Sequence, residues 1–336
     1  MGRGMVTMED VARLAGVSKM TVSNVVNNRD GVSDLVRRRV LEAIQQSGYR
    51  VNLSARTLKS GRTGVLGLAV PEIDLPYFSH LATLVIDAAR RRGYHVALER
   101  TGAVEAGEAD ALAHSRILQF DGLILSAVAL GGLDERLTEA GHPIVMLGEQ
   151  DFGGRFDHVA MPNEDGVKAA AMHLADQGCR RIGFVSGAPR DGVNVITRRY
   201  HGYLAGLAER GLAADPPLLF PLDDMTMEAG RDAAYRLVDS GLEVDGLVAV
   251  TDTVAAGVLR GLADRGLRVP GDVRLIGFDD VPQSRFLVPS LSSVAPDHRW
   301  MAEQAVELVV QRIHAPLRPT GQYVAPFELM IRESTR

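Results

Sequence analysis

From residue 65 onward, short apolar runs alternate with longer amphipathic segments, and this alternation limits the possible folds more than any other feature of the sequence. The apolar runs, which we expect to be strands, are residues 65–70, 94–98, 122–125 and 144–147. The segments between them that have apolar residues at helical spacing are 81–92, 109–120 and 133–140. Strands and helices that alternate in this way predict a parallel sheet with helices on both faces.

The same pattern starts again near Asp165, so two similar α/β units follow one another. The expected strands of the second unit are residues 181–186, 218–220, 246–250 and 273–277. Its expected helices are residues 165–177, 200–210, 229–240 and 255–265. Three later segments exceed what this unit needs, namely an apolar run at 291–294, a helix at 301–313 and a terminal run at 322–331. We therefore expect the chain to cross between two lobes more than once, with a cleft that opens by hinge bending.

Ahead of this pattern, residues 10–27 have the spacing of two short helices joined by a tight turn. One apolar face of the first helix is formed by Val11, Ala12, Leu14 and Ala15. Gly16 breaks that helix, and Ser18 can cap a second helix whose inward face is formed by Val22, Val25 and Val26. The outward residues near its N-terminus are Lys19, Met20, Thr21, Ser23 and Asn24. This arrangement is typical of a helix-turn-helix, which presents that end to a DNA major groove.

The segments on either side complete a small N-terminal head. Thr7 and Asp10 have the spacing of a capping box, which predicts that the first helix begins there. Ser33 can cap a third helix, whose expected apolar face is Val36, Val40, Leu41 and Ile44. Gly48 is expected to end that helix, and Tyr49 to pack over the shared core. Residues 52–62 are weakly apolar and have no strong reason to be helical alone, so they are interpreted as a conditional hinge.

The charges are distributed unevenly along the chain. The net charge is -5, yet residues 1–62 contain eleven Lys and Arg against five Asp and Glu. That part has a charge of +6, and the 26 basic and 37 acidic residues that remain give the rest a charge of -11. A basic head on an acidic body indicates that only the head approaches phosphates favourably.

The composition is that of a packed soluble protein, with 46% hydrophobic and 24% charged residues. No apolar run approaches the roughly 18 residues that a membrane helix needs, and the first residues do not resemble a signal peptide. We therefore expect a bacterial cytoplasmic protein with no membrane partner. Cys179 is the only cysteine, which excludes an intrachain disulfide and a zinc site built on paired cysteines. We expect no metal and no cofactor.

Common catalytic motifs are also missing from the sequence. The chain lacks Gly-x-Gly-x-x-Gly after a strand, Gly-x-x-x-x-Gly-Lys-Ser/Thr, Gly-x-Ser-x-Gly and His-Glu-x-x-His. Asp279 and Asp280 are adjacent on an expected loop, where two carboxylates rarely converge on one substrate atom. These observations indicate that the protein is not an enzyme.

Two segments of the chain resemble the lactose-repressor/galactose-repressor family of bacterial transcription regulators. The first reads Glu9-Asp10-Val11-Ala12, then Ala15-Gly16-Val17-Ser18, Thr21-Val22-Ser23 and Val26-Asn27. The second reads Val273-Arg274-Leu275-Ile276-Gly277-Phe278-Asp279-Asp280, with Pro289-Ser290-Leu291-Ser292-Ser293-Val294. The resemblance covers residues 7 to about 332. It implies an all-α helix-turn-helix head and an α/β effector domain with two lobes, similar to periplasmic sugar-binding proteins.

The domain boundaries follow from the pattern and the resemblance together. We place the head at residues 1–51, the hinge at 52–62 and the effector-binding and dimerisation domain at 63–336. Within that domain, the N-lobe is expected to contain residues 63–161 and 295–322. The C-lobe is expected to contain residues 162–294 and 323–336.

In this family a dimer places two recognition helices in successive major grooves, and paired hinge helices insert a leucine into the minor groove. Leu58 matches that leucine, and Ala55 matches the small residue that lets the hinge helices approach. The alternative for Leu58 is a linker residue packed on the effector domain. Asn52 matches the family pattern, although Val51 replaces the proline that commonly precedes it. Arg56 is expected to contribute phosphate contacts that do not depend on base sequence.

The recognition helix contains the residues expected to select the DNA sequence. Lys19 and Met20 occupy variable positions of the family pattern, and Asn24 stands where the lactose repressor has arginine. Asparagine suits adenine, whereas arginine favours guanine. The residues that match phosphate-contacting positions are Thr7, Ser18, Thr21, Ser23, Asn27, Ser33 and Tyr49. For Ser18 and Ser33, helix capping is compatible with phosphate contact, because a capped N-terminus also points amides at a phosphate.

Candidate ligand contacts follow the expected strands, because ligands of open α/β sheets lie beyond the carboxyl ends of the strands. These candidates are Tyr77, Phe78, Ser126, Glu149, Thr251 and Asp279. Arg199 matches an arginine that holds effectors in the family. Aromatic faces beside an arginine and carboxylates suit a sugar, since the rings cover apolar CH patches and the charged groups bond hydroxyls.

Each of these candidates has a structural alternative. Asp279 can cap a turn, the two aromatic residues can be core at the lobe interface, and Arg199 can pair with a nearby acid. Val193 and Val195 fall where some relatives carry polar ligand contacts, which leaves the ligand class open between a sugar and a nucleobase.

We therefore expect a DNA-binding transcriptional repressor whose affinity for a palindromic operator is controlled by a sugar-like effector. The alternatives are a periplasmic-type solute-binding protein, which the basic head and the lack of a signal peptide disfavour, and a nucleobase-responsive repressor. An inducer that releases the repressor from DNA and a corepressor that strengthens DNA binding would use the same cleft and the same linkage. The sequence therefore does not specify whether the effector lowers or raises DNA affinity. Because no leucine heptads follow the last expected strand before Arg336, we expect a homodimer.

Overall fold

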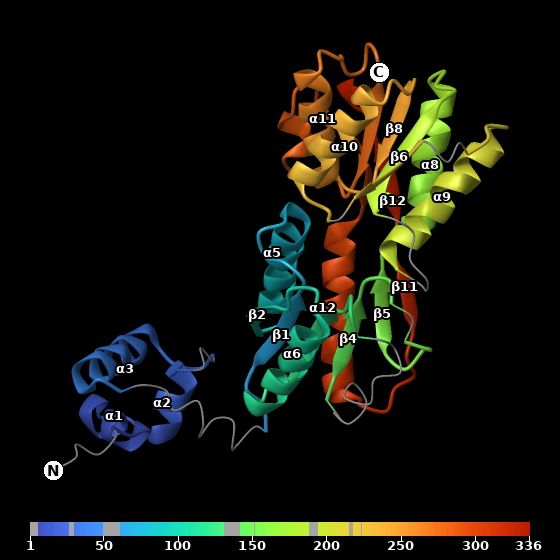
Figure 1. Ribbon diagram of the computed structural model, residues 1–336. Coiled ribbons are helices and arrows are strands. Elements are labelled where there is room, and N and C mark those ends of the chain that lie inside the picture. Colours follow the sequence, from blue (N-terminus) through green and yellow to red (C-terminus); the bar gives the residue numbers. More distant parts are fainter. Residues whose placement is uncertain are drawn as a thin grey trace. The chain divides into compact units, whose positions relative to one another are not determined.

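The computed structural model describes residues 6–26, 30–49, 61–130, 142–150, 152–187, 194–214, 218–222 and 224–336. The chain divides into two compact units, Met1–Thr63 and Gly64–Arg336 (Figure 1). The first unit is the helical head, and the second contains two lobes.

The head is built from three helices, α1 (Met8–Ala15), α2 (Lys19–Val26) and α3 (Asp34–Ser47). The predicted capping box is present, since the Thr7 hydroxyl and the Asp10 carboxylate each accept a hydrogen bond from the other residue's backbone N–H. Gly16 ends α1 in the left-handed region at φ 61°, a conformation that costs glycine little. Ser18 Oγ then accepts from the Thr21 backbone N–H at 3.1 Å, which confirms the predicted cap of α2.

The head differs from the prediction in two core leucines and in one helix cap. Leu14 and Leu41 were expected to face inward, but they are 53% and 52% exposed, and Ala43 occupies the buried position on α3 instead. Ser33 stands at the N-cap of α3 without a side-chain capping bond. The buried residues are Val11, Ala12, Ala15, Val22, Val25, Val40, Ala43 and Tyr49. The space between three short helices is narrow and closely packed. Small alanine side chains fit in it, whereas the larger side chains of Leu14 and Leu41 face outward.

The first lobe is a six-stranded sheet covered by helices on both faces. The strand order is β11-β5-β4-β3-β1-β2, and neighbouring strands are parallel. The strands are β1 (Val65–Val70), β2 (His95–Arg100), β3 (Gly122–Ser126), β4 (Ile144–Leu147), β5 (Asp157–Ala160) and β11 (Gln322–Val324). The helices are α5 (Pro76–Arg91), α6 (Glu105–Ile117) and α12 (His298–His314). Alternate residues of β1 and β3 pack against α5 and α12 on one face and against α6 on the other.

The second lobe repeats this design. Its strand order is β12-β10-β9-β8-β6-β7, with β12 antiparallel to β10. The strands are β6 (Ile182–Gly187), β7 (Leu219–Leu222), β8 (Gly246–Ala249), β9 (Arg274–Phe278), β10 (Ser292–Pro296) and β12 (Phe327–Met330). The helices are α8 (Asn163–Asp176), α9 (Val195–Glu209), α10 (Met227–Asp239) and α11 (Asp252–Asp264), with short 3-10 turns η2 (Ser284–Phe286) and η3 (Glu333–Thr335). Helices α8 and α9 cover one face of the sheet, and α10 and α11 cover the other.

The chain passes between the lobes after β5, after β10 and after β11. In Figure 1 the orange-red helix α12 stands beside the teal helix α5, although the two are far apart in sequence. Because β10 belongs to the second sheet and β11 to the first, the late segments complete both lobes rather than add a third. This interleaving places connecting segments at the junction of the lobes, where a hinge motion is expected.

Most predicted strands and helices of the two lobes are present, with boundaries that shift by a few residues. Strand β5 was missed, because Asp157-His158-Val159-Ala160 has no apolar run. The terminal run predicted at 322–331 is two strands that belong to different sheets. The helix predicted at 133–140 lies outside the described residues. Within the described part of the chain, no helix has the length and apolarity required to cross a membrane.

Candidate functional site

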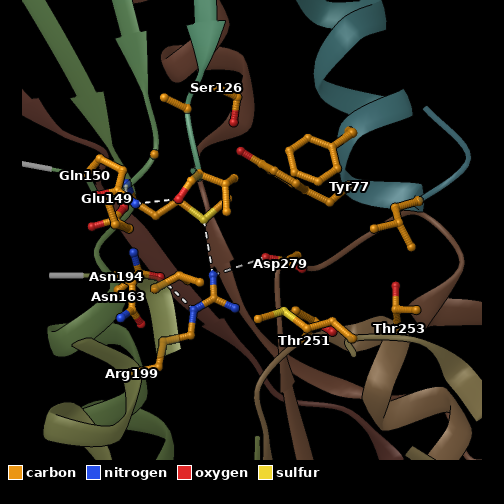
Figure 2. Close-up of a pocket in the computed structure, with 18 of the residues that line it drawn as sticks. Tyr77, Ser126, Glu149, Gln150, Asn163, Asn194, Arg199, Thr251, Thr253 and Asp279 are labelled. Carbon is orange, nitrogen blue, oxygen red and sulfur yellow. Dashed lines mark hydrogen bonds and ion pairs between the residues drawn. The ribbon is translucent and has the colours of Figure 1, made fainter. Parts of the chain in front are cut away.

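A pocket of about 170 Å³ lies between the two lobes of the second unit. Its walls include all seven residues that were predicted to contact a ligand, namely Tyr77, Phe78, Ser126, Glu149, Arg199, Thr251 and Asp279. Other polar residues that line it are Gln150, Asn163, Asn194 and Thr253. Figure 2 shows these side chains approaching one space from both lobes.

The folding of the two sheets explains this convergence. Ser126 is the last residue of β3, Glu149 follows β4, and Asp279 follows β9 directly. Thr251 caps α11 after β8 by accepting from the Val254 backbone N–H at 3.2 Å. The carboxyl ends of parallel strands meet at one edge of a sheet, so loops that are distant in sequence reach the same pocket.

Arg199 is held at the base of the pocket and is only 2% exposed. Its Nε donates to Asn163 Oδ1 at 2.6 Å, and its other nitrogens donate to the Val250 carbonyl and to Met161 Sδ. The guanidinium lies 3.6 Å from the Asp279 carboxylate and 3.6 Å from the centre of the Phe278 ring. Burial lowers the pKa of Arg199, and the Asp279 carboxylate opposes that shift. These contacts fix the planar guanidinium in one orientation.

Asp279 occupies an unusual backbone conformation beside this arginine. Its φ is 108° and that of Asp280 is 48°, values in the left-handed region that non-glycine residues rarely adopt. Burial raises the pKa of Asp279 to about 7, and Arg199 limits the rise. Strained residues of this kind persist where the surrounding structure holds them and are frequent at ligand sites.

Asp252 supports the turn that carries Asp279. It is 1% exposed, and its carboxylate accepts from the Val281 backbone N–H at 3.0 Å and from the hydroxyls of Ser284 and Ser293 at 2.5 and 2.6 Å. Burial, followed by the charge of Asp279, raises the pKa of Asp252 well above its ordinary value. This buried carboxyl therefore ties the start of α11 to the residues that follow β9.

Glu149 provides the carboxylate of the first lobe. It accepts from the Met161 backbone N–H at 3.2 Å and lies 3.3 Å from Arg198 Nε of the second lobe. Burial raises the pKa of Glu149, while bonds to Asn163 and to Met161 and the nearby arginines lower it. The pocket thus contains two acids, each beside an arginine.

The aromatic side of the pocket comes from the start of α5. Tyr77 and Phe78 meet edge to face with ring centres 4.8 Å apart, and His298 of α12 packs against Tyr77 at 5.2 Å. Burial lowers the pKa of His298 to about 4, so this imidazole is neutral near pH 7. The other residues of the lining are Leu75, Ala127, Val128, Gly148, Met161, Val195, Met225 and Met301. The lining therefore contains both apolar and polar side chains.

Several of these residues were not predicted. Asn163 and Met161 follow β5, so the rule that located the other candidates would have found them had that strand been recognised. Asn194 caps α9 by accepting from the Thr197 backbone N–H at 2.9 Å. Met301 comes from α12, which reaches the pocket only because the chain returns to the first lobe. The late segments predicted that return, but no local pattern predicted that Met301 lines the pocket.

The structure also places part of the predicted DNA-contacting set. Lys19 and Met20 are exposed at the start of α2, with Met20 67% exposed, and Asn24 is half-buried on the same helix. Thr7 and Ser18 are engaged in capping α1 and α2, and Tyr49 is buried in the core of the head. Thr21 and Ser23 are half-buried on α2, and Ser33 is exposed. The predicted residues outside the described part of the chain are Asn27, Asn52, Ala55, Arg56 and Leu58.

Two family models match the chain, one over the head and one over much of the two-lobed unit. The family model for bacterial regulatory proteins of the lacI family matches residues 7–52, and that for a periplasmic binding protein-like domain matches residues 171–335. The ribose operon repressor of Halalkalibacterium halodurans is 31% identical over 332 residues, which cover 99% of this chain and 98% of that protein. The chain belongs to the LacI family of bacterial regulatory proteins. It is therefore a DNA-binding transcriptional regulator with α1 to α3 as its DNA-binding domain.

Solved structures of LacI-family regulators have the same fold. One from Sanguibacter keddieii is 39% identical, with a TM-score of 0.76 over 82% of this chain and 99% of that one. A structure described as the complex of the transcriptional regulator CelR with cellobiose is 30% identical, with a TM-score of 0.72 over 98% and 99% of the two chains.

Proposed function

We propose that this LacI-family protein represses transcription from a palindromic operator and that a neutral sugar or sugar derivative in the pocket controls its affinity for that operator. The observation that carries the proposal is the convergence of Glu149 from the first lobe with Arg199 and Asp279 from the second on one pocket. A ligand that contacts all three stabilises one arrangement of the lobes over another.

The chemistry of the pocket supports a polyhydroxylated ligand. Carboxylates accept hydrogen bonds from hydroxyls, and side-chain amides both accept and donate, while Tyr77 and Phe78 can cover the apolar face of a pyranose ring. Arg199 is balanced by Asp279 and Arg198 by Glu149, so the pocket offers no surplus positive charge for a phosphate. The names of two relatives, a ribose operon repressor and a regulator solved with cellobiose, agree with this ligand class.

We assign separate roles to the residues of the head and hinge. Lys19, Met20 and Asn24 read base edges, because the N-terminal part of a recognition helix faces the major groove. The proposed phosphate contacts are Thr7, Ser18, Thr21, Ser23, Asn27, Ser33 and Tyr49. The proposed hinge contacts are Asn52, Ala55, Arg56 and Leu58, with Leu58 as the minor-groove wedge. Two copies of the chain would then bind the two halves of the operator in the bacterial cytoplasm, without catalysis.

A ligand screen tests the pocket assignment. Thermal melting of the full chain is measured with ribose, galactose, cellobiose, glucose 6-phosphate and adenine, with Arg199→Lys as the matched variant. We expect a neutral sugar to raise the melting temperature of the wild type, and we expect no shift for Arg199→Lys, because lysine lacks the planar fork. A shift with adenine or the sugar phosphate alone would refute the neutral-sugar assignment.

A second measurement tests the link to DNA. Full-length protein selects its operator from random duplexes, and operator affinity is then titrated with the sugar that shifts the melting temperature. A change in affinity in either direction supports the linkage. A truncated chain of residues 63–336 should keep sugar binding and lose operator binding. Unchanged DNA affinity in that truncation would contradict the division between head and body.

A further inference from the structure

An ion pair joins the recognition helix to the helix before it. The ammonium of Lys19, the first residue of α2, donates to Glu9 Oε1 of α1 at 2.7 Å. The two side chains are 61% and 66% exposed, so both are accessible to DNA. The hydrogen bond and charge of Lys19 lower the pKa of Glu9, so its carboxylate is ionised near pH 7.

The backbone on both sides of this pair is held by capping bonds. Glu9 lies between Thr7 and Asp10, whose mutual bonds form the capping box of α1. Lys19 follows Ser18, whose hydroxyl caps α2 through the Thr21 backbone N–H. Asp10 is engaged with Thr7 and with Arg13, at 3.2 Å from the latter. Both side chains therefore leave the first turns of capped helices, and the backbone positions from which they extend are fixed before DNA binds.

The pair presents a donor beside an acceptor at the end of the helix that enters the major groove. Both A·T and G·C present acceptors and a donor in the major groove, but only guanine offers two adjacent acceptors, O6 and N7, that one ammonium can bind together, and the cytosine N4 donor beside them suits a carboxylate. Lysine alone binds any acceptor or phosphate, because its ammonium is a point charge on a flexible stem. A carboxylate so close to DNA also repels phosphates, which weakens binding to every sequence.

We propose that Glu9 determines specificity together with Lys19: the two side chains read one G·C pair in each half of the operator, with Lys19 on guanine and Glu9 on cytosine. Because Glu9 holds the Lys19 ammonium, this ammonium is less available to phosphates. Glu9 therefore lowers the protein's affinity for non-specific DNA more than its affinity for the operator. This inference rests on the DNA-binding function of the LacI-family head and not on the identity of the effector.

The test compares full-length wild type, Glu9→Ala, Glu9→Gln, Lys19→Met and the double variant Glu9→Ala/Lys19→Met. Each protein is used to select its preferred binding site from a pool of random duplexes. We then measure, at one salt concentration, its affinity for the selected operator, for single-base variants of that operator and for random DNA. Glu42→Ala is the control, because Glu42 is an exposed acid of the same head on α3. It changes the net charge equally without touching Lys19.

We expect the wild type to prefer G·C at one position of each half-site by about tenfold, within the usual cost of a mismatch. Glu9→Ala should bind random DNA more tightly and lose most of that preference, and Glu9→Gln should shift it toward A·T, since glutamine suits adenine. In the Lys19→Met background, Glu9→Ala should change the preference little, because the two residues act as a unit. Glu42→Ala should raise affinity for all sequences without changing base preference.

Two results would overturn the proposal. One is a Glu9→Ala selection profile identical to that of the wild type in a protein with an unchanged melting temperature. The other is an equal effect of Glu9→Ala with and without Lys19. Operator binding by these variants would still be intact in either case, so failure of this inference is distinguishable from failure of the DNA-binding assignment.

Discussion

Glu149 of the first lobe and Arg198 of the second form an ion pair at 3.3 Å at the edge of the pocket. The glutamate side chain is 6% exposed and the arginine side chain 43% exposed, so one partner is buried and the other reaches solvent. A contact of this kind links the lobes directly and must change when the cleft opens. It is therefore placed to couple ligand binding to lobe closure.

The first prediction concerns this bridge. Arg198→Met should weaken sugar binding several-fold, because it leaves the buried Glu149 carboxylate without its partner in the other lobe. Salt should weaken sugar binding to the wild type and have less effect on the variant. Calorimetric titrations at low and high salt measure both effects. Arg210→Met, which removes the Arg210–Asp176 pair at the far end of α9, should leave sugar affinity unchanged.

The second prediction concerns pH and stability. Burial raises the pKa of Asp279 from 3.8 to about 7, so the folded chain binds this proton more tightly than the unfolded chain does. The resulting stabilisation is present below about pH 4 and is lost as the pH rises through about 7. Asp252 contributes in the same direction, so the test is the difference between wild type and Asp279→Asn in urea unfolding. Parallel curves for the two proteins from pH 4 to 8 would be inconsistent with the raised pKa.

The third prediction is the opposite trend for ligand affinity. If the sugar hydroxyls bond to ionised Asp279, the sugar should bind more tightly as the pH rises from 6 to 8. For a pKa of about 7 the gain is roughly tenfold, because ionisation of the free carboxyl limits binding at the lower pH. Calorimetry across this range measures it. A constant affinity would show that Asp279 is not the accepting carboxylate.

The fourth prediction concerns Glu108, a buried residue of α6 that does not line the pocket. Its carboxylate accepts from the backbone N–H groups of Val128, Ala129 and Leu130 at 2.7 to 3.3 Å, just beyond Ser126. In Glu108→Gln, the side-chain NH2 group would face these backbone N–H donors, which lose an acceptor. The change should lower the free energy of unfolding by about 1–3 kcal/mol. It should also weaken sugar binding, because Val128 lines the pocket. Asp110→Asn, an exposed change on the same helix, should do neither.

The fifth prediction concerns the packing that positions Arg199. An ideal Cβ on Gly202 of α9 would lie 2.2 Å from the Glu164 carbonyl oxygen of α8. Gly202→Ala should therefore push the two helices apart and destabilise the lobe by about 1–3 kcal/mol. It should also displace Arg199, which lies one turn before Gly202 on the same helix. Urea unfolding and sugar titration report these effects. Gly271→Ala is the control, because its Cβ would meet only the Arg268 side chain at 3.5 Å or more.

Local patterns were sufficient for much of this protein. The apolar runs at β1, β4 and β9 could be recognised because a buried parallel strand needs continuous apolar residues. The capping residues Thr7 and Ser18 could be recognised because a cap depends on neighbours three residues away. Strand β5 could not be recognised, since Asp157 and His158 are polar although buried. Asp157 is satisfied by Arg312 and Arg318, which are distant in sequence.

The sequence by itself determined the helix-turn-helix, the two α/β units and six of the pocket residues, because strand ends and helix spacing are local properties. A seventh, Arg199, was identified by its match to the family. Only the tertiary structure decided that Met301 and Asn163 line the same pocket, that Arg198 meets Glu149 across the lobes and that Lys19 is paired with Glu9. These relationships depend on how separate elements pack. Packing depends on contacts between residues far apart in the chain, and no local spacing in the sequence specifies it.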